Sequence, residues 1–186
     1  MILHLYGCVF IHVPKTGGVS ISNVLEIPRK YQGHTRLKDH KNHPDDYFKF
    51  CFVRNPWDRF VSCYFYFKEY GRGDNLDRHN GEIVNSFSSF DEFVRSFSVE
   101  NNKFRGLHFH DQIHFFDEKI NFVGKFENLQ EDFNFVCEKI NVPCQKLPHK
   151  NKSNHNHYTD YYNDETRKLV GKIYSNDIEA FGYKFE

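Results

Sequence analysis

Three short apolar segments, each followed by a helix-like pattern, restrict the possible folds more than any other feature of the sequence. They are CVFIHV (residues 8–13), YFKFCFV (47–53) and INFVGKF (120–126). Each is rich in aromatic or β-branched residues and ends in polar, turn-forming sequence, which is typical of strands. Strands that alternate with helices favour a mainly parallel sheet covered by helices. We therefore predict an α/β protein whose ligands bind beyond the carboxyl ends of the strands.

The helix after the second strand has the clearest signals. Asn55 is a suitable N-cap, Pro56 suits the first helical position, and Asp58 completes a capping box. Apolar side chains then form a stripe at helical spacing from Phe60 to Phe67. This pattern predicts a helix that packs one face onto the core.

Similar patterns predict three later helices. Ser89 and Asn128 are N-cap candidates, and each is followed three residues later by a glutamate, as in a capping box. The last helical stretch covers residues 164–183, breaks near Ser175 and stops at Gly182.

Length and composition indicate a single globular domain over residues 1–186. The chain has 21 Phe and 11 Tyr residues, so its core should consist largely of aromatic rings. Its 25 basic and 25 acidic side chains cancel, which leaves no overall field to attract nucleic acid or a membrane surface. No segment has the uninterrupted apolar length of a membrane span. Five cysteines without paired spacing, and a chain start without an export signal, predict a cytoplasmic protein.

The segment VPKTGG follows the first predicted strand and leads into a short predicted helix. Glycines let the backbone approach an anion, the helix N-terminus offers N–H groups, and Lys15 adds a positive charge. A nucleotide P-loop carries its lysine after the second glycine, whereas Lys15 precedes both Gly17 and Gly18. The loop therefore predicts an anionic ligand, and a small-molecule kinase or NTPase is an alternative to the interpretation that follows.

Four motifs are informative as an ordered set. They are VPKTGGVSI, FVRNPWDRFVSCY, VGKFENLQEDF and the closing region from HKNKSNHNHYTDYY to DIEAFGYKF. Together they resemble the sulfotransferases that use 3′-phosphoadenosine 5′-phosphosulfate (PAPS), in particular carbohydrate enzymes related to the uronyl 2-O-sulfotransferases. The resemblance implies a three-layer P-loop-like α/β fold with a mainly parallel central sheet flanked by helices. It also implies sulfuryl transfer from PAPS to a hydroxyl of a carbohydrate or small molecule, with 3′-phosphoadenosine 5′-phosphate (PAP) as product and no metal.

The resemblance assigns a role to each matching residue. Lys15 would contact the 5′-phosphosulfate and stabilise charge on the leaving oxygen, which makes it both a catalytic and a donor-binding residue. Arg54 and Ser62 would hold the 3′-phosphate. Backbone N–H groups and hydroxyls for the 5′-phosphate would come from Thr16, Gly17, Gly18, Val19 and Ser20. In the KNKS loop, Lys152 and Ser153 would approach the donor, although a solvated basic loop explains them equally well.

An acceptor hydroxyl needs a base, and histidine suits that task at neutral pH. The segment YQGHTRLKDH resembles the family segment that carries the catalytic histidine. This assigns the base to His34, with His40 and His43 as nearby alternatives. Two clusters could resemble metal ligands: His108, His110 and His114, and His155 with His157. An HxH pair is weak evidence without a third ligand at known geometry, so we predict no metal site. A binding module that keeps only the nucleotide site is the third hypothesis.

Overall fold

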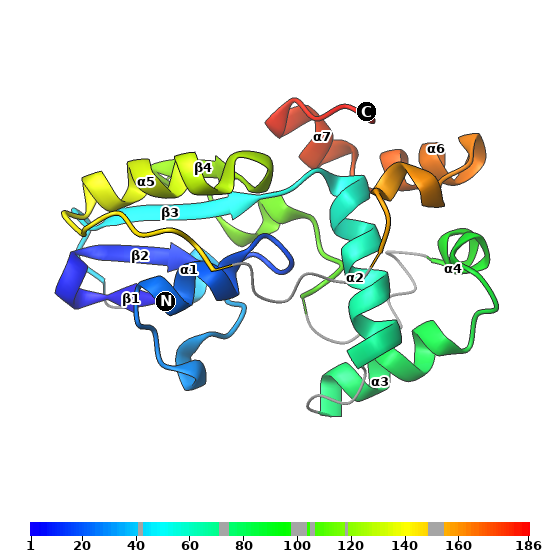
Figure 1. Cartoon of the computed structure of the whole chain (residues 1–186), viewed down its shortest axis with the longest axis horizontal. Helices are drawn as coiled ribbons and strands as arrows, with labels where there is room; N and C mark the ends of the chain where they lie inside the picture. Colours follow the sequence, from blue (N-terminus) through cyan, green and yellow to red (C-terminus); the bar gives the residue numbers. More distant parts are fainter. Residues whose placement is uncertain (41–42, 71–74, 98–103, 105–106, 118, 149–154) are drawn as a thin grey trace. The chain divides into compact units, whose positions relative to one another are not determined.

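The computed structural model describes residues 1–40, 43–70, 75–97, 104, 107–117, 119–148 and 155–186. Its contacts divide the chain into two compact units, each built from two separate stretches of sequence (Figure 1). The first unit comprises Met1–Arg54 and Gln112–Lys152, and the second comprises Asn55–Asp111 and Ser153–Glu186. Each unit has its own apolar core. The interpretation of residues 1–186 as one domain stays a prediction.

A four-stranded sheet forms the centre of the first unit. Its strands are β1 (Ile2–Leu3), β2 (Cys8–Ile11), β3 (Phe48–Val53) and β4 (Phe122–Lys125), in the order β1-β2-β3-β4. The pairs β2–β3 and β3–β4 are parallel, whereas β1 pairs with β2 antiparallel. The three predicted strands are thus confirmed, together with a mixed α/β architecture and a mostly parallel sheet. The P-loop-like character of the fold stays a prediction.

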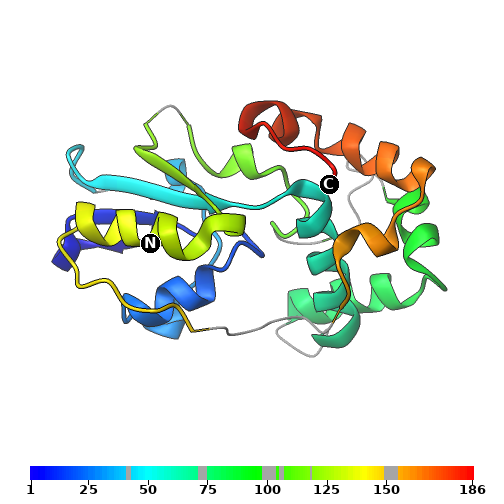
Figure 2. The same ribbon diagram turned by 45° about the horizontal axis from the view of Figure 1, so that its top comes forward.

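Two helices, α1 (Gly18–Val24) and α5 (Leu129–Lys139), contribute to the core on one face of this sheet (Figure 2). Phe10 pairs with Phe50 in the parallel register, and the two buried rings stack with their centroids 5.0 Å apart. Ile21 of α1 and Phe133 of α5 belong to the same buried cluster. Short 3₁₀ helices occupy the connections of this unit: η1 (His4–Tyr6), η2 (Arg29–Tyr31), η3 (Leu37–Asp39), η4 (Gln112–Phe115) and η5 (Phe126–Asn128).

Helices build the second unit around a core of aromatic rings. They are α2 (Pro56–Tyr70), α3 (Asn75–Asn85), α4 (Phe90–Ser96), α6 (Asp164–Ile173) and α7 (Ser175–Phe181), with the 3₁₀ helix η6 (Tyr158–Tyr161). The predicted stripe on α2 is confirmed, because Phe60, Tyr64 and Phe67 are buried. The ring of Phe60 lies 5.3 Å from that of Phe93 and 6.1 Å from that of Tyr174. The aromatic core expected from composition is therefore present.

The ends of three helices agree with the predicted signals. The Ser89 hydroxyl accepts a hydrogen bond from the Glu92 N–H at 3.1 Å. Asn55 Oδ1 accepts one from the Trp57 N–H, also at 3.1 Å. Gly182 follows α7 with a φ angle of 65°, in the left-handed region that favours glycine at this position. The predicted break in the last helical stretch is confirmed by the separation of α6 from α7.

Asn128 is the N-cap residue of α5, as predicted, but the predicted capping box is not formed. Its side chain makes no capping hydrogen bond with α5. The 3₁₀ helix η5 runs directly into α5, so Asn128 has φ −118° and ψ 31° instead of the extended backbone of a capping residue. Here the Asp132 carboxylate accepts a hydrogen bond from the Lys125 N–H, which ties the end of β4 to the first turn of α5.

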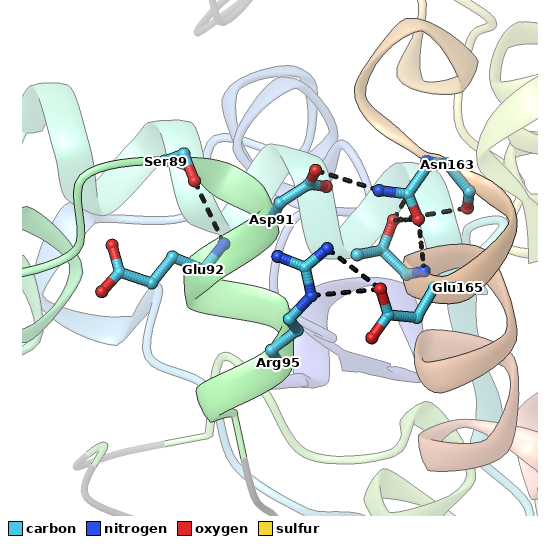
Figure 3. A network of polar contacts seen from close by, with 7 residues as sticks. Ser89, Asp91, Glu92, Arg95, Asn163 and Glu165 are labelled. Carbon is cyan, nitrogen blue, oxygen red and sulfur yellow. Dashed lines mark hydrogen bonds and ion pairs between the residues drawn. The ribbon is translucent and has the colours of Figure 1, made fainter.

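Figure 3 shows polar contacts that join α4 to α6 within the second unit. Arg95 donates to the Glu165 carboxylate from Nε at 3.1 Å and from Nη2 at 2.9 Å. Asn163 Nδ2 donates to the Asp91 carboxylate at 2.9 Å. The hydrogen bonds and opposite charges raise the pKa of Arg95 and lower that of Glu165. Because both side chains are exposed, this ion pair stabilises the fold only slightly.

Candidate functional site

The loop between β2 and α1 contains the predicted anion-binding motif. Lys15 and Gly17 both have positive φ angles, 68° and 82°. This left-handed conformation is unfavourable for a lysine and persists only where the surrounding structure holds it. The Thr16 hydroxyl donates to the Val13 carbonyl at 2.9 Å and closes the turn. A strained lysine at the carboxyl end of a central strand supports a functional role for this loop.

Gly17 and Gly18 are needed for packing. A Cβ atom on Gly17 would lie 2.6 Å from Leu129 Cδ2, and one on Gly18 would lie 2.1 Å from His12 Cδ2. Both distances are far below van der Waals contact, so the loop can approach α5 and the His12 ring only without side chains at these positions. Because packing alone explains the two glycines, Lys15 is the stronger indicator of function.

Arg54 follows β3 and is held beside the lysine loop. Its Nη1 atom donates to the Lys15 carbonyl at 3.2 Å. Its guanidinium lies over the Phe126 ring, with Cζ 4.1 Å from the ring centroid. Only 9% of the residue is exposed. The fold therefore brings together two cationic residues that the sequence places 39 positions apart, at the ends of adjacent parallel strands.

Gln112 fixes the backbone of Arg54 and is a site residue to which the sequence assigns no role. The Arg54 N–H donates to Gln112 Oε1 at 2.8 Å, and Gln112 Nε2 donates to the Arg54 carbonyl at 2.9 Å. The glutamine is fully buried. Since the two residues are 58 positions apart, no local pattern indicates this pair of hydrogen bonds.

His34 lies against His12, the residue that follows β2. Its Nδ1–H donates to the His12 carbonyl at 3.0 Å, and the two rings meet edge to face with centroids 4.3 Å apart. Burial lowers the pKa of His34, the hydrogen bond to the carbonyl opposes this shift, and the positive charge of Lys15 lowers the pKa further. His34 is therefore neutral at neutral pH, as a general base must be.

The two alternative bases are engaged elsewhere in the first unit. His40 Nε2 lies 2.9 Å from the amino nitrogen of Met1 and 2.7 Å from Thr35 Oγ1. Burial, followed by the charge of that amino group, lowers the pKa of His40 to about 4. His43 donates from Nδ1 to the Pro44 carbonyl at 3.0 Å. Of the three histidines, His34 has the contacts that link it to the lysine loop.

The remaining predicted site residues are less well connected. The Ser20 hydroxyl donates to the Pro148 carbonyl at 2.7 Å, so it anchors the segment before the KNKS loop. Val19 is partly buried in the first turn of α1. Ser62 is buried in α2, in the second unit. Lys152 and Ser153 lie outside the described residues.

A cavity of about 640 Å³ lies in the first unit, lined mainly by apolar side chains from the stretches 1–6 and 25–31. Gly33 and Thr35 line it as well, whereas the ring of His34 is directed to His12. Neither Lys15 nor Arg54 is among its lining residues. The cavity is therefore separate from the loop between β2 and α1 that carries Lys15.

The described part of the chain has neither a candidate metal cluster nor a candidate membrane span. No group of three or more His, Cys, Asp or Glu side chains there is arranged to hold a metal ion. None of its helices combines the length and apolar character needed to cross a membrane.

The first unit is thus an α/β structure with a mostly parallel sheet, and Lys15 and Arg54 lie at the carboxyl ends of adjacent strands, the edge at which such sheets bind their ligands. A family model described as "Sulfotransferase family" matches residues 1–184, so the chain belongs to the sulfotransferase family, whose members transfer sulfuryl groups. The family predicted from the four motifs is confirmed.

A relative of this chain is an "Uncharacterized protein" of Archaeoglobus fulgidus. It is 36% identical over 102 residues, which cover 53% of this chain and 72% of the relative. No solved structure matches the chain.

Proposed function

We propose that the protein transfers a sulfuryl group from PAPS to an acceptor hydroxyl by in-line displacement. The observation that carries this proposal is the hydrogen bond between the Arg54 guanidinium and the Lys15 carbonyl, which holds these two residues together at one end of the sheet. A donor with a phosphosulfate and a second phosphate needs several positive charges, and arginine suits a phosphate because its donors form a planar fork. Family membership adds sulfuryl transfer as the reaction.

In the proposed reaction, His34 accepts the proton of the acceptor hydroxyl while the acceptor oxygen attacks sulfur. The bond between sulfur and the bridging oxygen of the donor breaks, and the electron pair stays on the phosphate of PAP. Lys15 stabilises the charge that grows on that oxygen, an interaction that strengthens in the transition state. No covalent enzyme intermediate is required, since the motifs supply no activated nucleophile.

The other donor contacts are proposed from the family resemblance. Backbone N–H groups of Gly17, Gly18 and Val19 would face the 5′-phosphate. Ser62 would reach the 3′-phosphate, and Lys152 and Ser153 would approach the donor. The Thr16 and Ser20 hydroxyls already donate to backbone carbonyls, so we expect these two residues to shape the loop as well.

A carbohydrate hydroxyl is the acceptor that we propose first, because the motifs are most similar to those of carbohydrate enzymes. Incubation with labelled PAPS and separate sets of glycans, phenols and small alcohols tests this. Transfer to phenols or small alcohols alone would exclude the carbohydrate proposal while leaving the reaction type intact.

A cytoplasmic location of the protein also stays a prediction.

Adenosine 3′,5′-bisphosphate (PAP), the expected product, should raise the melting temperature without added metal. A ligand present at 100 times its Kd stabilises the fold by about 2.7 kcal/mol. For a chain of this size that corresponds to a shift of about 5–10 °C. ATP with magnesium is the matched control and should shift the melting temperature much less. No shift with the bisphosphate at millimolar concentration would rule out the proposed donor, and a larger shift with magnesium-ATP would favour the kinase alternative.

Arg54→Ala should weaken binding of the bisphosphate by about 10- to 100-fold, because a hydrogen bond to a charged group contributes about 1.5–3 kcal/mol. Isothermal titration calorimetry on the folded variant measures the affinity directly. Arg54→Lys is the control, since it keeps the charge but loses the planar fork and should give an intermediate affinity. Unchanged affinity in the alanine variant would remove Arg54 from the donor site.

A further inference from the structure

The backbone of Arg54 lies just beyond the paired part of the sheet. The last residue pairs of the two parallel ladders are Ile11 with Cys51 and Val53 with Lys125. Arg54 is buried, so its N–H and C=O groups need hydrogen-bond partners within the protein. These partners must come from outside the regular pairing of the strands.

The side-chain amide of Gln112 supplies both partners. Its Oε1 atom accepts the hydrogen bond from the Arg54 N–H at 2.8 Å, and its Nε2 atom donates to the Arg54 carbonyl at 2.9 Å. Glutamine and asparagine are the residues whose side chains present a carbonyl oxygen and an N–H₂ group side by side, as the backbone of a neighbouring strand would. Gln112 is fully buried at the start of η4. It therefore extends the hydrogen bonding of β3 by one residue.

The far end of the Arg54 side chain is held by two other residues. Its Nη1 atom donates to the Lys15 carbonyl at 3.2 Å, and its Cζ atom lies 4.1 Å from the centroid of the Phe126 ring. Both contacts depend on the position of the Arg54 Cα atom, from which the side chain extends. Gln112 therefore acts on the guanidinium through the backbone and does not need to touch an anion itself.

We propose that Gln112 is a positioning residue of the donor site, which holds the backbone of Arg54 so that the guanidinium is already in place when the donor binds. This inference rests on the proposed function, in which Arg54 binds a phosphate of PAPS. An arginine that is ordered beforehand loses less conformational freedom on binding than a mobile one, and the difference appears as affinity. Donor affinity is therefore the quantity that substitution of Gln112 should change.

Gln112→Met removes the donor and the acceptor but keeps an unbranched side chain of similar length. Isothermal titration calorimetry should show affinity for PAP weakened by about 3- to 10-fold, the cost of ordering one long side chain on binding. Gln112→Asn keeps the amide but is one methylene group shorter, so its affinity should lie between those of the wild type and Gln112→Met. It also serves as the test if Gln112→Met does not fold. Wild-type affinity in Gln112→Met would overturn the proposal.

Asn121→Leu is the matched control, because Asn121 holds the backbone of β3 near its other end. Its Oδ1 atom accepts a hydrogen bond from the Lys49 N–H at 2.7 Å. The control variant also loses a hydrogen bond to this strand, yet it should bind PAP within about twofold of the wild type because distant sites act independently. An equal loss of affinity in Asn121→Leu and Gln112→Met would assign the effect to the strand as a whole and overturn the proposal.

The double variant Gln112→Met, Arg54→Ala tests whether Gln112 acts through the guanidinium. Once that group is removed, the substitution of Gln112 should change the affinity for PAP no further, because the two effects are coupled. A residue that only stabilises the fold, or that touches the donor directly, would weaken binding to the same degree with and without Arg54. That result would overturn the proposal.

Hydrogen exchange of the Arg54 backbone N–H gives a readout that does not depend on a ligand. In the free protein this N–H should exchange at least about 10-fold faster in Gln112→Met than in the wild type, because its partner is lost. The Cys51 N–H in the same strand reports any general loss of stability and should change much less. Unchanged protection of the Arg54 N–H would overturn the proposal. If the wild type binds no PAP, the proposed function fails, while this comparison still decides whether Gln112 holds Arg54.

Discussion

Lys15→Ala should lower kcat by about 10²- to 10³-fold, the loss that follows removal of one group that stabilises a developing negative charge. Lysine and alanine both carry a Cβ atom, so the left-handed backbone conformation at this position is equally unfavourable for both residues. The Lys15 carbonyl, which accepts the hydrogen bond from Arg54, is retained. The variant therefore tests the amino group and not the loop. Transfer of labelled sulfate under saturating donor and acceptor measures kcat.

Lys15→Arg is the matched control, since it keeps a positive charge with different geometry and should lose less activity than Lys15→Ala. The pH profile adds an independent test. The charge of Lys15 contributes to the lowered pKa of His34, so its removal should raise that pKa. A base is active only when neutral, hence the fall in rate at acid pH should begin at a higher pH in Lys15→Ala. A turnover equal to the wild type would remove Lys15 from the mechanism.

Local patterns were sufficient to predict the elements that build the parallel part of the sheet. The segments around Phe10, Phe50 and Phe122 are aromatic or β-branched runs with abrupt polar ends, and all three form adjacent strands. The stripe on α2 and the glycine that ends α7 were predicted for similar reasons. In each case the signal lies within a few residues of the element that it predicts.

Elements that depend on tertiary contacts were missed. β1 is two residues long and exists through its antiparallel pairing with β2, so it has no pattern of its own. Asn128 is the N-cap residue of α5 as predicted, but its capping box does not form because the preceding turn is already helical, which the sequence pattern does not reveal. The division into two units follows from contacts between distant stretches of the chain, which no local pattern indicates.

In the candidate site too, some residues can be recognised from local sequence motifs and others only from contacts in the fold. Lys15 and Arg54 lie in motifs that the sequence displays directly, although their contact appears only in the fold. Gln112 and His12 act on residues 58 and 22 positions away, and their surroundings in the sequence give no sign of it. Sequence reasoning therefore identifies groups that would touch the donor more readily than the residues that hold these groups in place.

Gly18→Ala should be the most destabilising single substitution in the loop. The added Cβ atom would lie 2.1 Å from His12 Cδ2 and 2.2 Å from His12 Nε2. The His12 ring has little room to move, because it is packed between the rings of Phe10 and His34. Overpacking a buried site typically costs about 1–3 kcal/mol, and we expect a value at or above the upper end. For this chain length the melting temperature should fall by about 6–12 °C.

Two further variants test whether the contact with the His12 ring causes the loss of stability in Gly18→Ala. Gly33→Ala is the control, since a Cβ atom there meets nothing within 4 Å and its stability should stay within about 1 kcal/mol of the wild type. The double variant Gly18→Ala, His12→Ala removes the ring that the new methyl group would strike. Because the two residues are in contact, their effects should not add, and the double variant should be more stable than the sum of the single losses predicts. Additive losses would mean that Gly18 is needed for a reason other than the approach of His12, and the link between the glycine loop and the His12–His34 pair would have to be abandoned.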